Sequence, residues 1–396
     1  MSYPIRITHL ITGLCAGGAE IMLLRLLSAT DRSRFDVDVI SMMEIGITGE
    51  KIRGLGFRVR TLEMERERPS PLALTKLVSW LRRDRPQILA TWMYHANFLG
   101  SLVAPLAGGM PVVWGLHHGF LDVSLERRRT ILVARACGWM SRHLAAKVIC
   151  CSECTRQQHI PLGYDPSKMV VIRNGFDLDL FQPERGRRDE VRRELQIPAD
   201  APILFQAGRF HPEKDYRTLV EAAAILHQRV PEARFVLCGH DVTWKNETLA
   251  GWIDRAGLRD SFRLLGRRDD IPRLLNAADI ASSSSVGEAF SLAIGEAMCC
   301  EIPCVVTDVG DSAFEVGDTG RVVPSRSPQA FADAWASLLA MSQADRAELG
   351  RGARRRIEQN FSLPVVTAQY EQLYESVVRE VEAKPARHAL PSEVRR

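Results

Sequence analysis

The sequence predicts an α/β protein made of two doubly wound domains, each with a parallel sheet covered by helices on both faces. Short apolar runs alternate with longer amphipathic stretches along most of the 396 residues, which is typical of strand–helix units. The alternation pauses at residues 181–183, a charged stretch follows over 184–194, and the alternation then begins again. Two such series joined by a linker predict two Rossmann-like domains that face each other across a cleft.

The elements follow in order from the apolar runs. In the first series we expect strands at Ile5–Ile11, Asp36–Ser41, Val59–Leu62, Ile88–Thr91, Val112–Leu116 and Val148–Cys151, with helices between them such as Ala19–Ser28 and Pro71–Arg83. In the second series we expect strands at Ile203–Gln206, Arg234–Cys238, Phe262–Leu264, Asp279–Ser282 and Cys304–Thr307, with a helix at Tyr216–Gln228. We assign residues 1–183 to an N-terminal domain and residues 184–361 to a C-terminal domain.

The composition is that of a folded globular protein, with 46% hydrophobic and 25% charged residues and a net charge of +4. The charge is uneven along the chain. Residues 1–185 hold 24 Lys and Arg against 17 Asp and Glu, a balance of +7, which leaves −3 for the rest. A basic half fits contact with an anionic membrane surface or a nucleic acid, and it equally fits a solvated basic face.

The cysteines indicate a reducing compartment. Their number, nine, is odd, and several of them, such as Cys150 and Cys304, lie in apolar strands as buried thiols. Cys151 and Cys154 form one C-x-x-C without the second pair that a zinc site needs, so no metal site is expected. The N-terminus makes a poor signal peptide, and the uncharged run 86–121 is broken by prolines and glycines, so the expected location is the cytoplasm.

Ligands of doubly wound sheets bind beyond the carboxyl ends of the strands, so polar residues that follow strands are the candidates for a site. Gly17 and Gly18 follow the first strand and can let backbone N–H groups approach an anion, although a tight turn explains them equally well. The strand Val112–Leu116 ends in His117 and His118, and either imidazole can face the cleft.

Two cations follow the first strand of the second series. Arg209 and Lys214 lie between Ile203–Gln206 and the helix expected at Tyr216, whose N-terminus adds its own positive end. A guanidinium offers bidentate donors and an ammonium offers a compact charge, so the pair can hold a phosphate group. Two cations on a surface are equally common without such a role.

The stretch GEAFSLAIGEA, at residues 287–297, places Glu288 and Glu296 on either side of an expected helix start. Residues 289–292 would form the first turn, whose N–H groups have no partner within the helix and can cradle a phosphate. Glu296 lies one turn beyond Leu292 on the same face, and helical side chains lean toward the N-terminus, so its carboxylate would reach hydroxyls of a sugar. Glu288 would point into the cleft from the loop. The residues predicted to bind the ligand in this turn are Phe290, Ser291 and Leu292.

These residues resemble those of the retaining glycosyltransferases of family 4, which have the GT-B fold. The most specific part is 287–324, which contains the E-x7-E spacing of that family as Glu288 and Glu296. The resemblance covers nearly the whole chain. Supporting matches are Gly17-Gly18-Ala19-Glu20, His117, Asn174-Gly175, and Gly208-Arg209 with Lys214.

The resemblance implies transfer of a sugar from a UDP- or GDP-sugar to a saccharide or a lipid-linked acceptor, with retention at the anomeric carbon. It implies that Arg209 and Lys214 hold the donor diphosphate and contribute to catalysis. It further implies that Glu296 binds the nucleotide ribose and that Glu288 binds hydroxyls of the donor sugar.

The resemblance also implies that a histidine lies beside the donor sugar, and the register of the strand favours His117 over His118. The loop with Gly17 and Gly18 would face the diphosphate and the acceptor. The spelling D-x-D occurs at residues 177–179, but this is a linker, so we expect no metal cofactor, and cations and backbone N–H groups would neutralise the leaving diphosphate. No nucleic acid partner is expected.

The GT-B architecture implies that a last helix, near 362–382, crosses back onto the N-terminal domain, while residues 383–396 are expected to form a disordered tail. Two segments depart from the family. Residues 239–241 are Gly-His-Asp where relatives usually have a G-x-G-like turn, and residues 289–291 are Ala-Phe-Ser where relatives often have Gly-Phe-Pro. These departures leave the donor preference open.

Two other functions would fit parts of this sequence. A non-catalytic protein that binds nucleotide sugars or glycans on the same fold could lose Glu288, Glu296, Arg209 and Lys214, and this chain has all four. An NAD-linked oxidoreductase would need a ribose-binding acid after the second strand, where the chain has Ser-Met-Met at 41–43.

A basic segment in the first half of the chain bears on where in the cell the protein acts. Residues 126–130, Glu-Arg-Arg-Arg-Thr, are expected to open a helix that runs through Arg135, Trp139, Arg142 and Lys147, and residues 80–85 add a second basic, aromatic cluster. This pattern fits a domain that rests on an anionic leaflet at the inner face of the cell membrane, where the acceptor would be lipid-linked. A helix that packs on the core with a charged outer face fits equally well.

Overall fold

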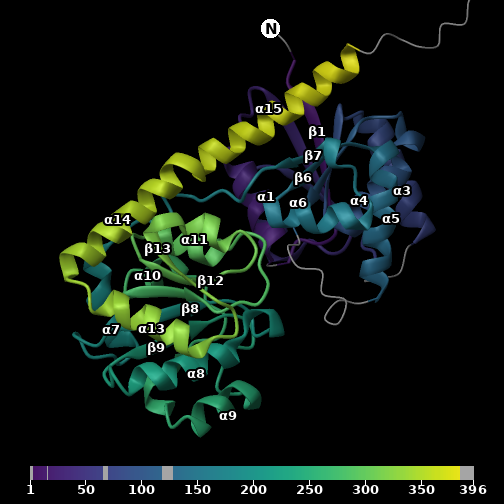
Figure 1. Cartoon of the computed structure of the whole chain (residues 1–396). Coiled ribbons are helices and arrows are strands. Elements are labelled where there is room, and N and C mark those ends of the chain that lie inside the picture. Colours follow the sequence, from purple (N-terminus) through teal and green to yellow (C-terminus); the bar gives the residue numbers. More distant parts are fainter. Residues whose placement is uncertain (1–2, 16, 66–69, 118–127, 384–396) are drawn as a thin grey trace, which may run out of the picture.

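The computed structural model describes residues 3–15, 17–65, 70–117 and 128–383, and in this part of the chain it has the two parallel sheets that the sequence predicts (Figure 1). The seven strands of the first sheet run in the order β3-β2-β1-β4-β5-β6-β7. The six strands of the second run in the order β10-β9-β8-β11-β12-β13. In both sheets the order reverses beside the first strand of the series, which creates the switch point where doubly wound sheets bind ligands.

The bounds of the strands are as follows. The first sheet contains β1 (Ile5–Ile11), β2 (Phe35–Ser41), β3 (Arg58–Thr61), β4 (Ile88–Trp92), β5 (Val112–Leu116), β6 (Ala145–Cys150) and β7 (Met169–Val171). The second sheet contains β8 (Ile203–Ala207), β9 (Arg234–Cys238), β10 (Phe262–Leu264), β11 (Ile280–Ser283), β12 (Cys304–Thr307) and β13 (Gly320–Val323).

The helices lie between and beside these strands. Those of the first half are α1 (Gly18–Ala29), α2 (Gly46–Gly54), α3 (Pro71–Asp84), α4 (Tyr94–Val103), α5 (Arg128–Leu144) and α6 (Glu153–His159). Those of the second half are α7 (Arg188–Glu194), α8 (Tyr216–His227), α9 (Glu247–Arg255), α10 (Ile271–Leu275), α11 (Leu292–Cys299), α12 (Ser312–Val316), α13 (Pro328–Leu339), α14 (Gln343–Asn360) and α15 (Leu363–Glu382).

All eleven predicted strands are present, and their bounds differ from the predicted ones by a few residues at most. The sequence did not predict β7 and β13. Both lie at the edge of a sheet, where a strand has one neighbour. With three and four residues, and with Gly320 and Arg321 in β13, neither forms the long apolar run that marks a strand covered on both faces.

Each sheet is covered on both faces, as doubly wound sheets require. Helices α3, α4 and α5 cover one face of the first sheet with buried residues such as Leu77 and Met140, and α1 and α15 cover the other with Met22 and Tyr370. The second sheet has α11 and α14 on one face and α8, α9 and α13 on the other. The chain therefore has two separate hydrophobic cores with a layer of sheet inside each.

The two domains are joined by two chain segments that lie side by side. The N–H of Phe176 donates to the carbonyl of Phe361 (2.9 Å), and the N–H of Leu363 donates to the carbonyl of Phe176 (2.8 Å). Helix α14 packs on the second domain, and from this junction α15, yellow in Figure 1, runs over the first domain. The domain boundary between residues 183 and 184 stays a prediction. Ile172 packs in the core of the first domain, and Phe181 packs in the core of the second.

The basic helix of the first domain differs from the prediction at its C-terminal end. Helix α5 is described from Arg128 onward, so Glu126 and Arg127 lie outside the described residues, as do residues 384–396 of the predicted tail. Lys147 does not belong to the helix, because α5 ends at Leu144 and β6 begins at Ala145. Among the described residues, no helix has the length and apolar character needed to cross a membrane.

Candidate active site

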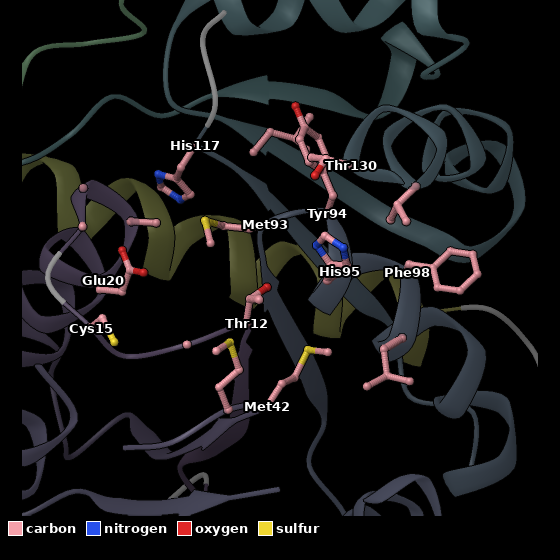
Figure 2. Close-up of a pocket in the computed structure, with 18 of the residues that line it drawn as sticks. Thr12, Cys15, Glu20, Met42, Met93, Tyr94, His95, Phe98, His117 and Thr130 are labelled. Atoms are coloured by element: carbon pink, nitrogen blue, oxygen red, sulfur yellow. The ribbon is translucent and has the colours of Figure 1, made fainter. Parts of the chain in front are cut away.

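A cavity of about 1970 Å³ lies between the two domains. Its walls come from the start of α1 and the ends of β4 and β5 in the first domain, and from the segments after β8 and before α11 in the second. Figure 2 shows the part that belongs to the first domain. All predicted site residues except Glu296 line the cavity. They are Gly17, Gly18, His117, Arg209, Lys214, Glu288, Phe290, Ser291 and Leu292.

The starts of α1 and α11 meet at this cavity from opposite domains. A Cβ atom on Gly18 would lie 3.8 Å from Cδ1 of Leu292, which is ordinary van der Waals contact. Helix N-termini carry unpaired N–H groups and a partial positive charge. Two such termini beside one cavity favour an anionic ligand there.

The two predicted cations line the cavity next to acids. Lys214 is in the short 3-10 helix Pro212–Lys214, and its ammonium group is paired with the Glu288 carboxylate, which also accepts from the Ser285 hydroxyl (3.0 Å). Arg209 lies 3.5 Å from a carboxylate oxygen of Glu213 and is 60% exposed at the side chain. Arg209 is therefore the more accessible cation, while Lys214 is held against the floor of the site.

The helix that the sequence places at residues 289–292 begins later than predicted. Helix α11 starts at Leu292, with Ser291 as its N-cap, whose hydroxyl accepts from the N–H of Ile294 (3.4 Å). The N–H of Ser291 donates to a carboxylate oxygen of Glu315 (3.0 Å). In the described part of the chain, Leu292 and Ala293 line the cavity, and their N–H groups have no hydrogen-bond partner.

Contacts from behind the cavity wall fix Phe290 and Glu288, which are part of that wall. Phe290 is 4% exposed, and its carbonyl accepts from the side-chain amide of Asn174 (3.0 Å). Gly310 has φ +58°, and a Cβ atom there would lie 2.1 Å from the carbonyl oxygen of Glu288. Only a glycine at position 310 therefore allows the loop that contains it to pack directly against the segment that carries Glu288.

Glu296 is paired with an arginine that the sequence reading did not single out. Arg25, in α1, donates to the Glu296 carboxylate and, through its other terminal nitrogen, to the carbonyl of Gly175 (3.3 Å). Both side chains are nearly buried, with 9% and 13% exposure. Burial raises the pKa of Glu296, and the Arg25 guanidinium opposes that rise. Glu296 lies one helical turn below Leu292, behind the cavity wall.

His117 lies at the end of β5 and lines the cavity as a neutral imidazole. Its ring stacks on Trp92 with centroids 4.7 Å apart and an interplanar angle of 11°. Burial lowers the pKa of His117 to about 4. Among the described residues, its buried Nε2 atom has no hydrogen-bond partner. His118 lies outside the described residues, so the choice between the two histidines stays a prediction.

Two further acids belong to the site. Glu20, which was part of a matched motif without a role of its own, lines the cavity near His117 (Figure 2), and burial raises its pKa. Glu315 is fully buried behind α11, and burial raises its pKa well above the usual range.

One feature of the sequence could have pointed to Arg25 as a buried, paired residue. It is an arginine on the apolar face of α1, between Met22 and Leu26.

The sequence predicts that the C-x-x-C formed by Cys151 and Cys154 does not bind a metal ion. Burial raises the pKa of Cys151 to about 12, and a thiol in that state is a poor metal ligand. Within residues 3–15, 17–65, 70–117 and 128–383, no group of three His, Cys, Asp or Glu side chains is placed to hold a metal ion.

Comparison with known proteins gives the same family for both domains. The sequence model described as "Glycosyltransferase Family 4" matches residues 16–180, and the one described as "Glycosyl transferases group 1" matches residues 187–356. Together they cover most of the chain.

Relatives and solved structures agree with this. The chain is 27% identical over 313 residues to UDP-Gal:alpha-D-GlcNAc-diphosphoundecaprenol alpha-1,3-galactosyltransferase of Escherichia coli, covering 77% of this chain and 80% of the relative. It is 31% identical over 223 residues to D-inositol 3-phosphate glycosyltransferase of Corynebacterium glutamicum, covering about half of each, 54% and 53%. The crystal structure of Anabaena Alr3699/HepE in complex with UDP has a TM-score of 0.81 at 24% identity, covering 94% of this chain and all of that one.

The buried histidines predict how the stability of the N-terminal domain depends on pH. His9 in β1 accepts a hydrogen bond from the indole of Trp92 (2.9 Å), and burial lowers its pKa to about 3. Unfolded histidines bind a proton near pH ~6.5. The unfolded state therefore takes up more protons below pH ~6.5, and the free energy of unfolding should fall as the pH falls, by about 1.4 kcal/mol per pH unit for each such histidine.

Urea denaturation between pH 7.5 and 4.5 measures this dependence. His9→Gln keeps an acceptor for the Trp92 indole and should flatten the decline, whereas His143→Gln, a change at an exposed histidine, should leave it as in the wild type. Equal slopes for the wild type and His9→Gln would contradict the assignment.

Proposed function

Since the chain belongs to the glycosyltransferases of family 4 and has their GT-B fold, we propose that it transfers a sugar from a UDP- or GDP-sugar to a lipid-linked saccharide with retention at the anomeric carbon. The observation that carries this proposal is the cavity where the cations of the second domain and the starts of α1 and α11 come together. A polyanion with a sugar at its end is the ligand that such a set of groups suits.

The donor diphosphate would lie between Arg209, Lys214 and the N–H groups of Leu292 and Ala293. As the bond from the anomeric carbon to the diphosphate breaks, negative charge grows on the leaving oxygen, and groups fixed in advance around it lower the barrier. The acceptor oxygen then bonds to the same face of the sugar, and its proton leaves with the diphosphate. Two cations and two backbone donors supply the stabilisation that a metal ion provides in other transferases, so we propose a metal-independent reaction.

The sugar and the ribose would contact the remaining site residues. Glu288, which pairs with Lys214, would accept from hydroxyls of the donor sugar. His117 lines the cavity as a neutral imidazole and would contact the same sugar. Glu296 pairs with Arg25 behind the cavity wall, so it would accept from the ribose hydroxyls only after its carboxylate turns toward the cavity.

The acceptor is proposed from the relatives. The Escherichia coli relative acts, by its name, on GlcNAc-diphosphoundecaprenol, so we propose a lipid-linked saccharide in the biosynthesis of a cell-surface polysaccharide or glycolipid. The protein would then work in the cytoplasm at the inner face of the membrane.

The exposed face of α5 supports contact with that membrane. Arg128, Leu132, Arg135, Trp139 and Arg142 all lie on this face, and Leu132 and Trp139 are each 69% exposed. Basic residues that alternate with exposed apolar ones suit an anionic leaflet. The second predicted cluster is weaker support, because the Trp80 ring already lies under the charged groups of Arg60 and Lys76.

Transfer assays test the reaction itself. With a panel of UDP- and GDP-sugars, a lipid-linked saccharide acceptor and excess EDTA, the wild type should release nucleoside diphosphate and form a product of unchanged anomeric configuration. Arg209→Ala and Lys214→Ala should each lower kcat about 10²–10³-fold. Arg217→Ala, an exposed arginine paired with Glu221 on α8, is the matched control and should not change kcat. A strict need for Mg²⁺ or Mn²⁺, or inversion of the sugar, would overturn the mechanism.

The roles of Glu296 and Arg25 can be separated by kinetics. Glu296→Ala should raise the donor KM and reduce kcat/KM by about 2–4 kcal/mol in transition-state free energy, because ribose hydroxyls lose their acceptor in a dry site. Arg25→Gln should make the donor KM depend on pH, rising as the pH falls, because the pKa of Glu296 rises further without the guanidinium. Unchanged kcat/KM in Glu296→Ala for every donor would remove the ribose assignment.

Vesicle sedimentation tests the membrane contact. Changing Arg128, Arg135 and Arg142 together to Gln should weaken binding to anionic vesicles at low salt by very roughly 3 kcal/mol, or about 1 for each charge. The charge-matched control changes the exposed Arg217, Arg229 and Arg259 of the second domain to Gln and should bind as the wild type does. Equal binding of the α5 variant and the wild type would contradict the contact.

A further inference from the structure

The cavity extends well beyond the groups that a nucleotide sugar needs. Ligand sites usually enclose roughly 300–1,000 Å³, whereas this cavity has about 1970 Å³. Beyond His117 and Met93 it continues within the first domain, between α3, α4 and α5. In Figure 2, His117 and Glu20 lie at one end of this extension and Phe98 at the other. We call this extension the apolar arm.

The walls of the apolar arm are mostly apolar, and polar side chains from the same helices and loops also line it: Glu65, Thr75, Ser79, Arg82, His95, Arg129 and Thr130. Helix α4 and the turn after it contribute residues at four-residue spacing, which lie on one face of the helix: Tyr94, Phe98, Leu102 and Leu106. Helix α3 contributes Leu74 and Val78, α5 contributes Leu132 and Val133, and the ends of β2 and β3 contribute Met42, Met43 and Met64. Within α4 the row from Tyr94 to Leu102 spans roughly 12 Å, since a helix rises about 1.5 Å per residue. Leu106 follows in the short 3-10 helix Pro105–Ala107.

Several of these side chains are exposed although they are large and apolar. Leu102 is 47%, Leu106 is 60% and Leu132 is 69% exposed. A contiguous apolar surface of this kind marks a binding site for another apolar group. The methionines along the floor can adapt to an irregular occupant because their side chains are flexible and polarizable.

The occupant follows from the continuity of the arm with the cleft. We propose that the apolar arm binds the hydrocarbon chain of a polyisoprenyl diphosphate-linked acceptor, at the end of the chain that is joined to the diphosphate. An apolar group in the arm can be covalently joined to a polar head in the cleft, because one cavity contains both. We choose a single polyprenyl chain because the proposed acceptor is of the kind named for the Escherichia coli relative, a sugar linked to diphosphoundecaprenol. This inference rests on the proposed function.

The position of the arm also agrees with the proposed membrane contact. Leu132 belongs both to the wall of the arm and to the exposed face of α5. A chain that leaves the arm at this helix would enter the leaflet on which α5 rests. The acceptor would thus stay in the membrane at its far end while its saccharide enters the cleft.

Binding of soluble prenyl diphosphates to the full-length protein tests the inference without a transfer assay. Below their critical micelle concentrations, geranylgeranyl diphosphate should bind at least ~10-fold more tightly than geranyl diphosphate, because ten more carbon atoms leave water. Inorganic diphosphate and dioctanoyl phosphatidylglycerol should bind more weakly than either. Isothermal titration calorimetry gives all four affinities.

Variants identify the surface. In Leu102→Gln/Leu106→Gln the two prenyl diphosphates should differ by less than ~3-fold, because burial of the longer chain is lost. Both leucines are exposed enough for the variant to fold. Leu72→Gln, on α3 outside the cavity and 77% exposed, is the matched control and should keep the wild-type difference.

The outcomes separate this inference from the proposed function. If UDP or GDP binds and the nucleotide sugar is cleaved, yet the two prenyl diphosphates bind equally, the apolar arm does not hold the chain and the proposed function still stands. Tight binding of the diacyl lipid would also overturn the single-chain occupant. If no nucleotide binds, the proposed function fails first.

Discussion

The ion pair between Arg25 and Glu296 is the interaction on which the arrangement of the site depends. It joins α1 of the first domain to α11 of the second, below the ends at which both helices meet the cavity. Removing one partner of a nearly buried pair leaves an uncompensated charge, which costs about 3–5 kcal/mol. The pair therefore sets the register of two helix N-termini toward each other, with Gly18 beside Leu292.

Further contacts tie the domains around this pair. The carboxylate of Asp311 accepts from the N–H groups of Glu153 and Cys154 (both 2.9 Å), so a loop of the second domain caps helix α6 of the first. The paired segments at Phe176 and Phe361 form the hinge side of the same interface. Polar contacts of this kind can be exchanged for contacts with a ligand, whereas the cores of the two domains stay intact. We infer that donor binding acts on the interface and not on the sheets.

The sequence predicted the fold because buried parallel strands appear as apolar runs of the right length, and Val112–Leu116 and Arg234–Cys238 match the observed strands. It could not place Arg25, because hydrophobic periodicity assigns a residue to a face and does not name its partner in another domain. The start of α11 was set too early because the capping role of Ser291 depends on the buried Glu315, which comes 24 residues later in the chain. Such long-range partners are fixed by tertiary packing.

The central claim is that a nucleoside diphosphate binds where α1 and α11 begin. Amide hydrogen exchange followed at single-residue resolution, with and without UDP or GDP, tests this most directly because the backbone donors themselves report on the contact. Exchange at Leu292 and Ala293 should slow markedly on binding, and the segment of residues 208–216 should be protected with them. Binding of UDP or GDP that leaves the exchange of Leu292 and Ala293 unchanged would contradict the account.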